Sequence, residues 1–230
     1  MNVEPTTTVG TSSPSVSHVF WISVAVFLCY FGLIGNGYLF RLVSPAMDDG
    51  AVILRESINL GMVALIAWVV WRIERRSLRS VGMQWRPWLP TVGWSLAVAF
   101  ICLVTAVGLM LLIQLMGTTY GEENPFAQLS LWTVTLITIR AGVAEEFMMR
   151  GYMLSRIEEW SGSTTVAVAL TLIPFALMHY SQGPAGVLIS FVLGGILTAF
   201  YVWKRDLLTN MIAHFLVDFL ANVALAPPTS

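Results

Sequence analysis

The chain has 230 residues, of which 57% are hydrophobic and only 11% charged, and its mean hydropathy is +0.76. Soluble globular domains carry about 25% charged residues, so the composition argues against a soluble domain. The net charge of −1 gives no support for nucleic-acid binding, and we expect no nucleic-acid partner. We predict an all-α fold, namely a polytopic transmembrane helix bundle in a lipid bilayer.

The N-terminal 17 residues are rich in Ser, Thr and Pro and lack the basic region of a signal peptide. We therefore expect a disordered polar N-terminus followed by a retained helix. A transmembrane helix needs about 20 apolar residues. About seven apolar runs come close to that length, at residues 19–40, 52–71, 90–116, 129–150, 164–180, 185–203 and 207–225.

Basic residues cluster at three ends of these predicted spans. The segment 72–86 carries five arginines, Arg150 and Arg156 mark a second end, and Lys204 and Arg205 mark a third. With seven spans, all three ends fall on one side of the membrane. The loops on the other side carry Asp48, Asp49, Glu122 and Glu123. The positive-inside rule then predicts a cytoplasmic N-terminus and an external C-terminus.

Charged side chains also occur inside the predicted spans, where each costs about 2.5–3.5 kcal/mol or more. Glu146 and Arg150 are four residues apart on one helix face, so they can pair. Glu145 is rotated by about 100° from Glu146, and its carboxylate is left for acid–base chemistry. Arg140 has no comparable pattern, and we expect it to pair with a carboxylate of the bundle or to reach the outer side.

Two further polar clusters contain histidine. Phe175 and His179 follow Pro174 near the end of the fifth span. The last span carries a polar residue at every fourth position: Asn210, His214, Asp218 and Asn222. An aspartate one turn from a histidine can orient the imidazole, stabilise its cation or complete a metal shell.

These side chains suit a water molecule, bound to a metal or activated by a carboxylate, that attacks an amide. No serine or cysteine of the last four spans lies in a nucleophile motif. From the residues alone, an intramembrane hydrolase and a proton-coupled transporter remain open. The two related halves usual in transporters are absent from the sequence, which makes the transporter the weaker alternative.

Taken together and in this order, the three clusters resemble the motifs of the CPBP family. These are the CAAX-protease and bacteriocin-processing intramembrane endopeptidases, also called the Abi family. The resemblance covers about residues 127–225. Its motifs are E-E-x-x-x-R at Glu145, Glu146 and Arg150, F-x-x-x-H at Phe175 and His179, and H-x-x-x-N/D at His214 and Asp218.

The resemblance implies a catalytic helix core over residues 127–225, preceded by N-terminal transmembrane helices over 18–126 and followed by a tail over 226–230. It implies an endopeptidase that cleaves membrane-bound or lipid-modified peptides or proteins, by default in a bacterial inner membrane. A non-catalytic membrane scaffold that keeps the protease fold is the alternative.

The resemblance also implies roles for the motif residues. Glu145 would activate the water with help from His179, while His214 and Asp218 would bind a metal or stabilise the oxyanion. Asp218 stands where the CAAX branch has Asn, which favours metal ligation or orientation of His214 and argues against a true CAAX substrate. Glu146 and Arg150 would orient the site, and Phe175 would support it. If the enzyme uses a metal, we expect Zn²⁺ at Glu145, His179 and His214.

The depth of these residues conflicts with a shared site. A straight-helix estimate at 1.5 Å per residue places Glu145 and His214 roughly 10 Å from the basic side, and His179 about 20 Å from it. We expect the site to lie within the membrane and to open toward the cytoplasm.

Overall fold

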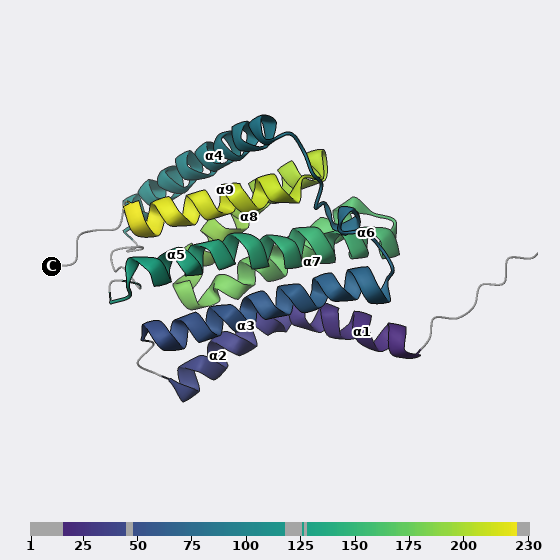
Figure 1. The fold of residues 1–230 in the computed structure, drawn as a ribbon. Coiled ribbons are helices and arrows are strands. Elements are labelled where there is room, and N and C mark those ends of the chain that lie inside the picture. The colour runs from purple at the N-terminus through teal and green to yellow at the C-terminus, as the bar shows by residue number, and fades with distance from the viewer. Residues whose placement is uncertain (1–15, 45–47, 118–125, 127, 225–230) are drawn as a thin grey trace, which may run out of the picture.

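The computed structural model describes residues 16–44, 48–117, 126 and 128–224. Within these residues the protein is a bundle of helices without strands (Figure 1). The predicted all-α transmembrane bundle is therefore confirmed. Several predicted features lie outside the described residues: most of the expected polar N-terminus, the tail at 226–230, and Glu122 and Glu123. Val16 and Ser17 already belong to the first helix.

Each predicted span overlaps one long helical segment, and several segments contain a wider π-helical stretch. In chain order they are α1 (Val16–Phe27) continuing through Leu28–Gly32 into α2 (Leu33–Val43); α3 (Asp49–Trp68) with Val69–Ile73; α4 (Trp88–Leu115); α5 (Leu131–Arg140) through Ala141–Leu154 into α6 (Ser155–Ser161); α7 (Thr164–Leu177) with the 3₁₀ turn Met178–Gln182; α8 (Gly183–Lys204); and α9 (Leu207–Phe219) with Leu220–Ala224. A short 3₁₀ turn, Leu78–Val81, lies between α3 and α4.

Length and composition identify four stretches that can cross a membrane: Val16–Val43, Asp49–Ile73, Trp88–Leu115 and Thr164–Lys204. The last of these covers α7 and α8, which were predicted as two spans. The segment Leu207–Val223 is a shorter apolar helix. The chain is thus an integral membrane protein with several apolar helices.

Short polar side chains start several of these helices. Asp48, Ser130, Ser163 and Asp206 each accept a hydrogen bond from a backbone N–H in the first turn of α3, α5, α7 and α9. Such caps satisfy donors that the first turn leaves free. Asp206 comes only two residues after α8 ends, so α8 and α9 form a tight hairpin.

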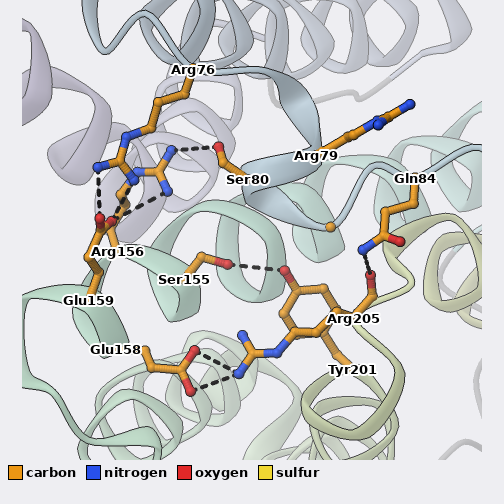
Figure 2. Close-up of a pocket in the computed structure, with 11 residues that line it drawn as sticks. Arg76, Arg79, Ser80, Gln84, Ser155, Arg156, Glu158, Glu159, Tyr201 and Arg205 are labelled. Carbon is orange, nitrogen blue, oxygen red and sulfur yellow. Dashed lines mark hydrogen bonds and ion pairs between the residues drawn. The ribbon is translucent and has the colours of Figure 1, made fainter.

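The arginine-rich ends meet at one end of the bundle, as predicted. This basic end comprises residues 72–87, α6 and residues 204–206. Its segments are joined by four ion pairs: Arg76–Glu159, Arg156–Glu74, Arg205–Glu158 and Arg86–Asp206. Figure 2 shows the first and the third of these pairs beside a pocket of about 330 Å³. Arg150 does not belong to this end, contrary to the prediction. Only 1% of Arg150 is exposed, because it lies inside the bundle on buried partners.

Two of these pairs should respond to acid. The hydrogen bonds from Arg205 to Glu158 and from Arg76 to Glu159 hold the pKa of each carboxyl below its usual range. Their contribution to folding is present above the ordinary glutamate pKa of about 4.3 and is lost as the pH falls through the lowered pKa. Both pairs are partly exposed, so we expect a loss of at most about 1 kcal/mol each. Melting temperatures between neutral pH and about pH 3 should fall less in Glu158→Gln/Glu159→Gln than in wild type; parallel curves would contradict this.

Candidate active site

The helix that carries the first motif packs closely on α9, which carries the third. Gly142 lies where a Cβ atom would be 2.6 Å from the carbonyl oxygen of Met211 and 3.0 Å from the backbone nitrogen of Phe215. Both obstacles are backbone atoms of α9, so a side chain at position 142 cannot fit unless the helices move apart. Glycine therefore permits the close approach that brings the motifs together.

We expect Gly142→Ala to destabilise the protein by about 1–3 kcal/mol, because overpacking forces the backbone to shift. The matched control is Gly93→Ala on α4, where no atom lies within 4 Å of the added Cβ. That change should be neutral or stabilising by up to about 1 kcal/mol. Thermal unfolding in detergent measures both, and equal melting temperatures for the two variants would contradict the tight contact.

Glu146 lies at the centre of the contact between the motif helices. It is fully buried, and its Oε1 accepts hydrogen bonds from Arg150 Nη1 and from His214 Nδ1, each at 2.9 Å. Asn210 Nδ2 donates to the other oxygen at 3.1 Å. The predicted pairing of Glu146 with Arg150 is thus present. Because three donors occupy this carboxylate, it holds the motif helices together and has no oxygen free for a substrate or water.

His214 lies between two carboxylates. Because the Glu146 carboxylate can only accept, Nδ1 of His214 is the donor in that bond. Its Nε2 faces Oδ2 of Asp218 at 3.5 Å, one turn further along α9. A protonated imidazole satisfies both neighbours. Asp218 is held near His214 as the motif suggested, and its side chain is 31% exposed.

Glu145 has a different environment from its neighbour. Its Oε1 accepts a hydrogen bond from Arg140 Nη1 at 2.9 Å, and its side chain is 15% exposed. Among the described residues its other oxygen, Oε2, accepts no hydrogen bond. Glu145 does not share the partner of Glu146, as predicted from the rotation between them. Arg140 pairs with a bundle carboxylate, which was one of its two expected positions.

Phe175 joins the site through Arg150, and His179 contacts Phe175. The Arg150 guanidinium lies 4.1 Å from the centroid of the buried Phe175 ring. One turn further from the basic end, the 3₁₀ turn that follows α7 carries His179, and the neighbouring helical segment carries Glu146. His179 Nδ1 lies 3.0 Å from the carbonyl oxygen of Phe175, which can only accept, so Nε2 carries a free lone pair in the neutral ring.

This register corrects the straight-helix estimate, which placed Glu145 too close to the basic side. The estimate measured the fourth span from Arg150 but the fifth from its first residue. The helix of Arg150 in fact continues to Ser161, and Gly162, with φ +67°, ends it one residue before the cap of α7. Arg150 is therefore about three turns inside the bundle, at the level of Phe175.

The three predicted zinc ligands do not form a ligand set in this arrangement. Among the residues that the structure describes, no three His, Cys, Asp or Glu side chains are arranged to hold a metal ion. Glu145 faces Arg140, and both nitrogens of His214 face carboxylates. Zinc dependence stays a prediction.

The structure adds a residue from the N-terminal half that the motifs did not include. Glu56 on α3 is fully buried, and its Oε2 lies 2.6 Å from Arg140 Nε and 2.9 Å from Asn59 Nδ2. It also pairs with Arg55. Arg140 thus bridges Glu56 and Glu145. The sequence did contain one indication of Glu56: a glutamate inside an apolar span is energetically costly unless a partner compensates its charge.

Comparison with known proteins finds a match only for the part of the chain that carries the three motifs. Residues 127–220 match the family model described as type II CAAX prenyl endopeptidase Rce1-like, which confirms the resemblance carried by the three motifs. This family supports an intramembrane peptidase. Helices α1 to α4, with Glu56, lie outside the match. No curated protein and no solved structure gives a significant match to the chain.

Proposed function

We propose that the protein is an endopeptidase that hydrolyses peptide bonds within the membrane. The match of residues 127–220 to the Rce1-like family model supports this proposal. Its substrates are membrane-bound or lipid-modified peptides or proteins. The distribution of arginines favours an N-terminus in the cytoplasm, and a bacterial inner membrane is the setting that the family resemblance implies.

One observation carries the proposal: two adjacent carboxylates have opposite environments. Glu146 is buried and accepts from three donors, while Glu145 is held through one oxygen and is partly exposed. A general base needs an accessible oxygen within reach of the attacking water. Glu145 meets this requirement and Glu146 does not. The salt bridge to Arg140 keeps the Glu145 carboxylate in one orientation.

In the proposed reaction, Glu145 Oε2 takes a proton from a water molecule while the oxygen of that water adds to the substrate carbonyl carbon. The resulting tetrahedral intermediate carries a negative charge. His214, protonated between Glu146 and Asp218, supplies a nearby positive charge that offsets it. Collapse breaks the C–N bond, and Glu145 returns its proton to the departing amine. His179 presents Nε2 as a hydrogen-bond acceptor for the water or the substrate.

The test is cleavage by purified protein in liposomes. A library of free, prenylated and transmembrane peptides is incubated with the protein, with and without added Zn²⁺ or chelator, and products are identified by mass spectrometry. The proposal predicts cleavage at defined bonds by wild type and strongly reduced cleavage by Glu145→Gln. Absence of cleavage by folded wild type under every condition would instead favour the non-catalytic scaffold. Equal cleavage by both proteins would refute the assignment of Glu145.

A further inference from the structure

The basic end carries more cations than its carboxylates can neutralise. Each of its four carboxylates, Glu74, Glu158, Glu159 and Asp206, pairs with an arginine. Within the described part of the chain, four cations at this end have no carboxylate partner: Arg72, Arg75, Arg79 and Lys204. Lys204 lies over the rings of Trp94 and Trp203. The other three, Arg72, Arg75 and Arg79, lie in the segment between α3 and α4.

Two of these unmatched arginines share one pocket. It has a volume of about 560 Å³ and is lined by Trp68, Trp71, Arg72, Ile73 and Arg75. The lining contains no carboxylate. Trp68 packs edge-on against Trp21 of α1, with 5.2 Å between the ring centroids, and this contact fixes one wall. Trp71 is 65% exposed and forms an open rim.

The backbone at Arg75 is a second, independent observation. The helix ends at Ile73 with Glu74 as its cap, and the next residue, Arg75, has φ +56° in the left-handed region. The N–H of Arg76 closes the turn on the carbonyl of Val70 at 3.0 Å. Glycine is the usual residue at this position because other side chains are strained there. An arginine at position 75 therefore lowers the stability of the fold. In return it places a second guanidinium in the pocket.

The position of the pocket identifies the chemistry of its ligand. It lies at the end of the membrane-crossing stretch Asp49–Ile73, and Trp71, Trp85 and Trp88 are exposed at the same end, as in an interfacial aromatic belt. The anions at that depth are the phosphates of lipid headgroups. Guanidinium groups bind phosphate through paired hydrogen bonds. We propose that the Trp68–Trp71–Arg72–Arg75 pocket binds the phosphate of an anionic phospholipid.

The test uses the full-length protein in detergent and native mass spectrometry. The probes are short-chain phosphatidylglycerol, phosphatidylcholine with the same tails, and inorganic phosphate as a competitor. The variant Arg72→Gln/Arg75→Gln removes the pocket cations. Its matched control is Arg41→Gln/Arg79→Gln, which also removes two exposed arginines without carboxylate partners in the described structure.

We expect wild type to retain phosphatidylglycerol in preference to phosphatidylcholine. The pocket variant should bind phosphatidylglycerol about 30-fold more weakly, since each arginine near a lipid surface contributes about a fivefold factor. The control variant should stay within about twofold of wild type, because its arginines lie outside the pocket. Equal losses in the two double variants would overturn the site in favour of general surface charge. Displacement of the lipid by inorganic phosphate at similar concentration would overturn the lipid assignment.

A third variant separates binding from folding. Arg75→Gly removes one cation and also relieves the left-handed backbone. We expect it to bind phosphatidylglycerol about fivefold more weakly while its melting temperature without lipid rises. Unchanged binding with a raised melting temperature would overturn the role of Arg75. This outcome does not depend on whether the protein cleaves peptides.

Discussion

Peptide cleavage should fall by about 10²–10⁴-fold in kcat when Glu145 is replaced by Gln, with KM little changed. The amide has nearly the same shape but cannot take the proton of the attacking water. The fold should persist, because the side chain is partly exposed and Arg140 keeps its bond to Glu56. Steady-state kinetics on a peptide identified in the liposome assay measure both constants.

The matched control for Glu145→Gln is Glu159→Gln, an exposed glutamate at the basic end. It should leave kcat within about twofold of wild type, since surface ion pairs contribute little. Glu146→Gln, in contrast, should lower both stability and activity, because it disrupts a buried carboxylate with three donors. Glu145→Gln with the kcat of wild type would contradict its role as the base.

Replacing Arg150 by Met should lower the free energy of unfolding by about 3–5 kcal/mol. The buried guanidinium donates to Glu146, to Thr198 Oγ1 at 3.2 Å and to the carbonyl oxygen of Gly194 at 3.1 Å. Methionine fills similar space, but it removes the positive charge that compensates the buried carboxylate of Glu146. Denaturant or thermal unfolding in detergent measures the loss.

Two controls make this prediction specific. Arg41→Met changes an exposed arginine near the end of α2 and should cost less than about 0.5 kcal/mol. The double variant Glu146→Gln/Arg150→Met should be more stable than Arg150→Met alone, because the uncompensated charge is gone. If Arg150→Met melted like Arg41→Met, the buried pair would not hold the motif helices together.

Hydropathy and local spacing predicted most of the fold. The seven apolar runs locate the helical segments, because burial in lipid demands long apolar helices with internally satisfied backbones. The pairing of Glu146 with Arg150 also followed from sequence, since residues four apart on a helix share a face whatever surrounds them. The closeness of His214 and Asp218 followed for the same reason.

What failed in the prediction depended on contacts between helices. Arg150 was placed at the basic end because its charge alone does not show that Thr198 and Gly194, on another helix, hold it inside the bundle. The depth of Glu145 was misjudged because it was measured from Arg150, although the helix ends at Ser161. Glu56 was missed because its partner Arg140 lies 84 positions away, on another helix. Such partners depend on tertiary packing, which the periodicity of a single helix does not contain.

The most direct measurement of the central claim is cleavage of one identified peptide by the liposome-reconstituted protein in ¹⁸O-labelled water. The account predicts that wild type places one ¹⁸O atom in the new carboxylate of the released fragment. It further predicts no ¹⁸O in the side chain of Glu145 after many turnovers, because Glu145 activates water and does not attack the carbonyl carbon itself. Label in Glu145 would contradict that mechanism, and no labelled fragment from folded wild type would contradict a hydrolase altogether.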